Sequence, residues 1–187
     1  MTTREAIGII AWKLDRELVV CTTGYTCRDM QAASDRPENF YMIGSMGLAA
    51  SIGLGVALSK PRAKVVVFDG DGSVLMGLGS LPMVGVLAPG NLIHLVFDNG
   101  VFASTGNQPT YSGSIPLDRL AVSCGYRQVA RAETPEELAG EWERLRSGAG
   151  PAFLLVKCRP DAGAPAERVR LQPESITERF MEAVHAS

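Results

Sequence analysis

The chain has 187 residues, a formal net charge of -2, 46% hydrophobic residues and 20% charged residues. These values are ordinary for a globular chain with a sizeable core, so we expect a single domain over residues 1–187, with a loop and a helix at 160–187. No cluster of Lys or Arg predicts a surface for nucleic acid or for an anionic membrane, which argues against both kinds of partner.

The sequence also argues against a membrane span or an exported protein. The longest uncharged stretch, residues 40–59, is long enough to cross a bilayer, but four glycines and three serines interrupt it, which favours a buried helix of small residues. The N-terminus lacks the basic and then apolar layout of a signal peptide. The four cysteines form no CxxC pair, so we expect reduced thiols and a cytoplasmic location.

Short apolar runs alternate with longer segments of helical periodicity. In chain order we expect a helix at 3–14, a strand at 18–21, a helix at 46–58, a strand at 64–68, a helix at 73–87, a strand at 92–97, a helix at 116–124, a strand at 128–132, a helix at 134–146, a strand at 152–157 and a helix at 173–184. The most apolar strands show no polar alternation, as is typical when both faces of a sheet are covered. The pattern predicts an α/β fold, a three-layer sandwich with a mostly parallel sheet.

Unusual residues follow three of these strands. In parallel α/β sheets ligands bind beyond the carboxyl ends of the strands, so the loops after Cys21, Phe68 and Phe97 are the candidates. The loop after Phe68 reads Asp-Gly-Asp-Gly-Ser at 69–73. Its glycines let backbone N–H groups approach an anion closely. Its second carboxylate would repel a bare phosphate, unless a hard cation lies between the two.

The loop after Phe97 offers further oxygen ligands. It reads Asp-Asn-Gly-Val at 98–101, with an amide oxygen on Asn99 and backbone carbonyls after it. Either loop alone is equally well explained as a plain turn. Together, on consecutive strands of one sheet, they indicate a Mg²⁺ ion that bridges the protein and a diphosphate.

The GDGS motif at 70–73, with Asn99 28 positions after Asp71, resembles the signature of thiamine diphosphate enzymes similar to pyruvate decarboxylase. The resemblance implies the diphosphate-binding (PP) domain fold of these enzymes, with thiamine diphosphate and Mg²⁺ as cofactors. It implies that Asp71, Asn99 and the Val101 carbonyl bind the metal. The residues around the diphosphate would be Gly70, Gly72 and Ser73. The family motif usually closes with two asparagines, and Asp98 replaces the first of them here.

Two further segments carry the resemblance. Gly44-Ser45-Met46-Gly47 matches the segment that grips the aminopyrimidine, with Met46 as the apolar wedge beneath the cofactor. Taken alone, Met46 would be interpreted as a core residue. The loop that begins at Thr23 matches one that touches the diphosphate, through Gly24, Tyr25 and Thr26. This second match is looser, because short polar loops are common.

Residues 39–58 and 98–110 are most similar to sulfopyruvate and phosphonopyruvate decarboxylases, including their separately encoded β subunits. Decarboxylases of simple pyruvate carry a glutamate six positions after the metal-binding asparagine, where this chain has Thr105. The difference favours the sulfopyruvate or phosphonopyruvate branch. Ser104 and Thr105 are candidates for contacting the anion of such a substrate, although a polar loop is also compatible with simple exposure to solvent.

The resemblance implies that the chain works with a partner. In the family, the glutamate that activates the cofactor lies in a separate pyrimidine-binding domain, so we expect a hetero-oligomer with an α subunit that supplies it, and we assign no catalytic residue here. The implied reaction is decarboxylation of an anionic 2-oxo acid to an aldehyde and CO₂. The alternatives are half of a carboligase or transferase, and a cofactor-binding module without catalytic activity. His94 lies within an apolar strand and is expected in the core.

Overall fold

The computed structural model describes residues 1–187, and its elements alternate along the chain as the sequence predicts. In chain order they are α1 (Thr3–Ala11), β1 (Leu18–Cys21), α2 (Tyr25–Ala33), β2 (Asn39–Tyr41), α3 (Ala49–Ser59), β3 (Val65–Gly70), α4 (Asp71–Met76), α5 (Ser80–Leu87), β4 (Leu92–Asp98), β5 (Val101–Phe102), β6 (Gln108–Pro109), a 3₁₀ turn (Ser112–Ser114), α6 (Leu117–Cys124), β7 (Gln128–Ala132), α7 (Pro135–Ser147), β8 (Ala152–Lys157) and α8 (Pro173–Ala186).

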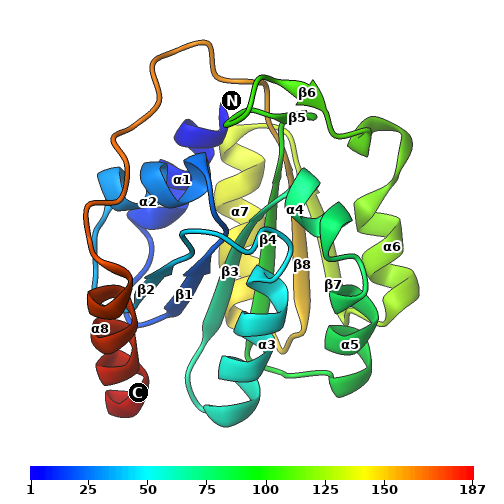
Figure 1. Cartoon of the computed structure of the whole chain (residues 1–187). Coiled ribbons are helices and arrows are strands. Elements are labelled where there is room, and N and C mark those ends of the chain that lie inside the picture. The colour runs from blue at the N-terminus through cyan, green and yellow to red at the C-terminus, as the bar shows by residue number, and fades with distance from the viewer.

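Six strands form one parallel sheet in the order β2-β1-β3-β4-β8-β7 (Figure 1). The chain leaves β1 toward β2 at one edge and returns to β3 on the other side of β1, so the strand order reverses between β1 and β3. Crevices for ligands form at such reversal points, beyond the carboxyl ends of the strands. The antiparallel β5–β6 hairpin lies beyond this same end of the sheet (Figure 1).

Helices cover both faces of the sheet, which confirms the predicted three-layer α/β fold. One core cluster lies under α1, α2 and α7, and the other lies under α3, α4, α5 and α6. The C-terminal helix α8 packs at the β2 edge, where the rings of Phe40 and Phe180 are 5.4 Å apart. None of the helices is long and apolar enough to cross a membrane.

The predicted helix at 134–146 is confirmed together with its start. The Thr134 hydroxyl accepts a hydrogen bond from the backbone of Glu137, and the Glu137 carboxylate accepts one from the backbone N–H of Thr134. This reciprocal pair satisfies two backbone donors that the first turn leaves unpaired.

Three predicted helices have wrong bounds, and the one expected at 3–14 ends at Ala11. The helix expected at 73–87 is divided into α4 and α5, because the chain bends at Gly77 to let the backbone of Gly47 approach. The helix expected from Met46 begins at Ala49, because Ser45 and Gly47 adopt positive φ angles of 57° and 95°. The elements α2 and β2 and the β5–β6 hairpin are not predicted from the sequence.

Candidate cofactor site at the carboxyl ends of the strands

A cavity opens where β1, β3 and β4 end. Its lining combines backbone glycines, hydroxyls and carboxylates with a few apolar side chains. The predicted site residues among its lining are Tyr25, Thr26, Met46, Gly70, Asp71, Gly72, Ser73, Asn99, Val101 and Ser104. The structure therefore brings together, in one cavity, residues that lie as much as 79 positions apart in the sequence, from Tyr25 to Ser104.

Asp71 and Asn99 are held by two neighbouring strands. Asp71 follows the last residue of β3, and Asn99 follows the last residue of β4, which pairs with β3 in parallel. Asp71 is 2% exposed and accepts a hydrogen bond from the hydroxyl of Thr110. The side-chain oxygen of Asn99 accepts a hydrogen bond from the backbone N–H of Val101 at 3.1 Å. The two side chains that the sequence proposes as metal ligands thus line the same cavity.

Burial raises the pKa of the Asp71 carboxyl, because the ionised form loses its hydration, and the nearby charge of Asp98 raises it further. Hydrogen bonds, first among them the one from Thr110, oppose this rise. Arg4 is the one Lys or Arg that lines the cavity, and its guanidinium is paired with Asp29 at 3.1 Å. A divalent cation would offset the buried charge of Asp71, so the lining is chemically suited to a metal bound with an anion.

Gly72 gives the cavity part of its shape. A Cβ atom at this position would lie 2.3 Å from Cε1 of Phe102, so any side chain would displace the Phe102 ring from the cavity wall. The glycine therefore allows the first turn of α4 and the β5 strand to approach each other closely.

Ser73 connects two loops of the site to α4. Its hydroxyl is fully buried, lies 2.9 Å from the Thr22 hydroxyl and accepts a hydrogen bond from the backbone N–H of Gly47 at 3.1 Å. The family resemblance implies that Ser73 lies beside the diphosphate. In the structure its side chain is engaged in holding the loop after β1 and the loop before α3 against α4.

The segment at 44–47, predicted to bind the aminopyrimidine, contributes residues to two different cavities. Met46 lines the main cavity, whereas Gly44 and Ser45 line a neighbouring apolar groove with Phe40 and Ile176. The positive φ at Ser45 and the loop conformation before α3 produce this split.

The segment after β1 is partly helical. Gly24, Tyr25 and Thr26 are predicted as a loop, but α2 begins at Tyr25. Tyr25 and Thr26 line the cavity, and Gly24, with a φ of 96°, lies against Ser104, whose hydroxyl oxygen would be 3.4 Å from an added Cβ atom.

The two candidate substrate residues are placed differently. Ser104 lines the cavity, whereas Thr105 does not. The Thr105 hydroxyl donates to the carbonyl of Phe102 at 3.3 Å and to the side chain of Gln108 at 2.9 Å, so it stabilises the hairpin instead.

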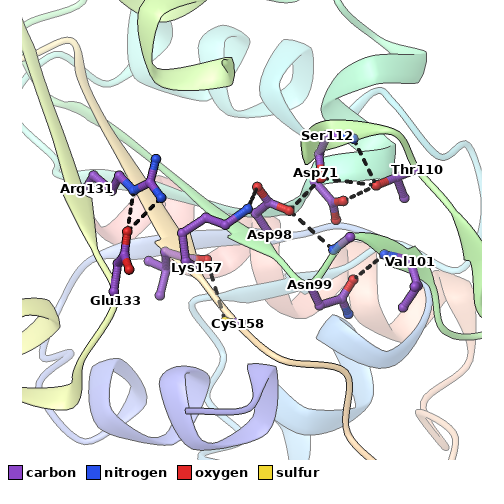
Figure 2. A network of polar contacts seen from close by, with 12 residues as sticks. Asp71, Asp98, Asn99, Val101, Thr110, Ser112, Arg131, Glu133, Lys157 and Cys158 are labelled. Carbon is purple, nitrogen blue, oxygen red and sulfur yellow. Dashed lines mark hydrogen bonds and ion pairs between the residues drawn. The ribbon is translucent and has the colours of Figure 1, made fainter. Parts of the chain in front are cut away.

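Asp98, where the family motif has an asparagine, is buried outside the cavity lining. It accepts hydrogen bonds from the Ser112 hydroxyl at 2.7 Å and from the Lys157 ammonium at 2.5 Å (Figure 2). Asp98 and Lys157 are paired residues of β4 and β8, so the adjacent strand supplies the positive charge that this carboxylate needs.

His94 is a satisfied core residue, as the sequence predicts. It is fully buried, with one ring nitrogen 3.2 Å from the carboxylate of Asp69 and the other 3.1 Å from the hydroxyl of Tyr126. It does not line the cavity.

Several residues of the site carry no signal in the sequence. These are Thr22, Arg4, Asp29 and Thr110, together with Asp161, Gly163 and Pro165 of the C-terminal loop. The loop crosses the end of the sheet near the start of α1 (Figure 1), where Arg4 donates a hydrogen bond to the carbonyl of Ala164 at 2.8 Å. Only the fold brings them together.

A family match spans the strands described above. Residues 19–156 match the family described as "Thiamine pyrophosphate enzyme, C-terminal TPP binding domain". The chain belongs to this family. The match covers β1 to β8, and therefore every strand that ends at the cavity.

Relatives and a solved structure extend the comparison. A phosphonopyruvate decarboxylase from Streptomyces hygroscopicus is 46% identical over 88% of this chain and 41% of its own length. The β subunit of sulfopyruvate decarboxylase from Methanothermobacter thermautotrophicus is 42% identical over 98% of this chain and 95% of its own length. The chain thus spans about two fifths of the phosphonopyruvate decarboxylases and nearly all of this β subunit.

A Mycobacterium smegmatis protein assigned as a thiamin diphosphate-dependent enzyme has a structure that matches 86% of this chain and 32% of its own, with a TM-score of 0.73 and 20% identity. This likeness supports the fold alone.

Proposed function

We propose that the chain is the diphosphate-binding subunit of a two-chain, thiamine diphosphate-dependent decarboxylase of anionic 2-oxo acids. Its substrate would be sulfopyruvate or phosphonopyruvate, and the products would be the corresponding aldehyde and CO₂. The observation that supports this most is that Asp71 and Asn99, at the ends of adjacent strands, line one cavity in a chain of this family.

Different residues of the chain would bind the metal ion and the diphosphate. Asp71, Asn99 and the Val101 carbonyl would hold Mg²⁺, a hard cation that prefers such oxygen ligands. Gly70, where an added Cβ atom would meet no other atom within 4 Å, would leave room for the diphosphate, and the backbone of Gly72 would lie beside it. When bound, thiamine diphosphate supplies the electron sink that the loss of CO₂ from a 2-oxo acid requires.

Other residues would orient the cofactor and the substrate. The remaining candidates for cofactor contacts are Gly24, Tyr25, Thr26, Gly44, Ser45, Met46 and Ser73. Ser104, which lines the cavity, would donate a hydrogen bond to the substrate anion. Thr105 has no such position, because its hydroxyl is engaged within the hairpin. The activating glutamate would come from a pyrimidine-binding α subunit, so the active form would be a hetero-oligomer.

The choice of sulfopyruvate or phosphonopyruvate as substrate is supported by relatives that are named as decarboxylases of these compounds. A β subunit of sulfopyruvate decarboxylase aligns over nearly its whole length, which favours a separate partner chain here too. We infer from the same comparison that the chain is one domain, with 160–187 as its closing loop and helix.

The test is turnover with a partner. The chain would be co-expressed with a pyrimidine-binding chain encoded beside it, and CO₂ release would be measured with thiamine diphosphate, Mg²⁺ and sulfopyruvate, phosphonopyruvate or pyruvate. The proposal predicts turnover of one of the two anionic substrates, lost in Asp71→Ala and absent without the partner. Carboligation products without net aldehyde release would favour a carboligase or transferase instead. Cofactor binding without any turnover of a 2-oxo acid would favour a non-catalytic module.

A further inference from the structure

Thr110 links the two segments that carry the proposed metal ligands, the start of α4 and the loop after β4. It lies just after β6, is buried, and donates its hydroxyl proton to the carboxylate of Asp71, 39 positions earlier (Figure 2). Its backbone N–H donates to the carbonyl of Gly100 at 3.0 Å, in the loop that contains Asn99. One residue therefore contacts the start of α4 through its side chain and the loop after β4 through its backbone.

A second hydroxyl two residues later separates the two nearby carboxylates. Ser112 donates to Asp98 at 2.7 Å, and the hydroxyls of Thr110 and Ser112 are 3.2 Å apart. The intervening Tyr111 has a positive φ of 64° and an exposed side chain, and this turn directs both hydroxyls inward. The Asp98 carboxylate thus accepts hydrogen bonds from Ser112 and Lys157. Of the two carboxylates, only that of Asp71 lines the cavity.

A metal ligand works best when its own orientation is fixed. A carboxylate can rotate about its terminal bond, and a donor held on one oxygen fixes that rotation while the other oxygen remains for the metal. Mg²⁺ is sensitive to this rotation, because it requires near-ideal octahedral geometry, whereas Ca²⁺ accepts irregular coordination.

We propose that Thr110 is a positioning residue that orients the Asp71 carboxylate for the metal and so favours Mg²⁺ over Ca²⁺. This inference rests on the proposed function, because it assumes that Asp71 binds the metal of a thiamine diphosphate site. Thr110 itself touches neither substrate nor cofactor in this account. Ser112 and Lys157 engage the Asp98 carboxylate, which does not line the cavity.

The test is a calorimetric titration of Mg²⁺ and, separately, of Ca²⁺ into the assembly with the partner subunit at saturating thiamine diphosphate. Thr110→Val removes the hydroxyl at constant shape, Thr110→Ser retains it, and Thr177→Val makes the same change at an exposed position of α8. Thr110→Ala is a second deletion of the hydroxyl, for use if Thr110→Val does not fold. Thermal unfolding in metal-free buffer is recorded for each variant, so that a loss of folding is recognised directly.

The expected result is a Mg²⁺ affinity about 10- to 100-fold lower in Thr110→Val and Thr110→Ala, with a smaller loss for Ca²⁺, as is typical when the support of a metal ligand is removed. Thr110→Ser and Thr177→Val should retain the wild-type affinities. Unchanged Mg²⁺ affinity in both deletions would overturn the role of Thr110, and so would an equal loss for both metals.

Asp71→Asn distinguishes this failure from failure of the proposed function. If Asp71→Asn abolishes Mg²⁺ binding but the Thr110 variants retain it, the metal site at Asp71 is supported and only the positioning role of Thr110 is wrong. If wild type binds no metal with the cofactor, or if Asp71→Asn leaves binding intact, the proposed function is wrong and this inference falls with it.

Discussion

At the scale of single residues, Asp71 is a buried carboxylate whose charge no Lys or Arg of the cavity neutralises. Burial raises its pKa, so the folded chain binds a proton at Asp71 more tightly than the unfolded chain does. Where the unfolded state binds fewer protons, the free energy of unfolding falls as the pH rises. Ionised Asp71 therefore lowers the stability of the metal-free chain at neutral pH, and this effect disappears as the pH falls through its raised pKa and then the lower pKa of the unfolded state.

We predict that Asp71→Asn raises the free energy of unfolding of the metal-free chain at neutral pH. The difference from wild type should shrink under acidic conditions, where the carboxyl is protonated in both states. Urea unfolding with a chelator at the two pH values measures it. A variant less stable than wild type at neutral pH would show that the Asp71 charge is already well compensated within the chain.

Lys157 belongs to the same network and has a different effect. It neutralises Asp98, which is 2% exposed, while its own side chain remains 30% exposed. Removal of one member of a buried ion pair leaves an uncompensated charge and typically costs about 3–5 kcal/mol, which partial exposure of the lysine reduces.

We predict that Lys157→Met lowers the free energy of unfolding by about 2 kcal/mol. Adding Asp98→Asn, which restores the asparagine usual in the family, should recover most of this loss. Lys13→Met, which breaks an exposed pair with Glu143, should cost less than about 1 kcal/mol. Additive effects of Lys157→Met and Asp98→Asn in denaturant unfolding would contradict the pairing.

At the scale of elements, the loop before α3 and the bend between α4 and α5 fit together through glycines. A Cβ atom at Gly77 would lie 1.9 Å from the carbonyl oxygen of Gly47, whereas one at Gly79 would meet no atom within 4 Å. The contact involves backbone atoms, which cannot rotate away as the end of a side chain can. The position of Met46 in the cavity therefore depends on a glycine 31 positions later.

We predict that Gly77→Ala lowers the free energy of unfolding by about 2–3 kcal/mol, as overpacking does, and weakens cofactor binding by displacing the 43–48 segment. Gly79→Ala is the matched control. It should be neutral or stabilising by about 0.5 kcal/mol, because it restricts the unfolded chain without a clash. Equal stabilities of the two variants in urea unfolding would mean that the loop adjusts freely.

The sequence predicts the elements with strong local patterns and misses those that depend on distant contacts. The strands β3, β4 and β8 are mostly apolar and show no polar alternation, and α7 has its complete start signal, so these follow from local residues. The strand β2 has three residues, and α2 begins with polar residues after Gly24, so neither has a periodic pattern long enough to identify it.

The candidate site divides in the same way. Asp71, Asn99 and Met46 lie within recognisable motifs. Thr110 contacts Asp71 only because a hairpin turns back, and Arg4 lines the cavity only because α1 packs beside α2; no local pattern specifies either arrangement. Thr105 has a suitable side chain and a suitable position in the sequence, yet the hairpin directs its hydroxyl elsewhere.

At the scale of the whole molecule, the C-terminal segment joins the cavity to the edge of the sheet. Its loop contributes Asp161, Gly163 and Pro165 to the lining of the cavity. Its helix α8 buries Phe180 against Phe40 and pairs Arg179 with Asp35 at 2.8 Å. Since α8 contributes to both core clusters, we expect it to unfold together with the rest of the chain.

We predict that Phe180→Ala lowers the free energy of unfolding by about 3 kcal/mol, because it removes a large buried ring. Unfolding of wild type should be one cooperative transition, with coincident curves from far-ultraviolet circular dichroism and from tryptophan fluorescence, where Trp142 is fully buried on the opposite face from most of α8. A separate early transition in the circular dichroism curve would contradict the single-domain account.

A crystal structure of the chain with its partner, thiamine diphosphate and Mn²⁺ in place of Mg²⁺ would test directly whether Asp71, Asn99 and Val101 bind the metal of a thiamine diphosphate site. The anomalous signal of Mn²⁺ locates the metal independently of any expectation. We expect one anomalous peak, in the cavity. It should mark a metal ion bound by the Asp71 carboxylate, the Asn99 side-chain oxygen and the Val101 carbonyl, with the diphosphate beside Gly72. A cofactor bound elsewhere, or a metal held without Asp71, would contradict it.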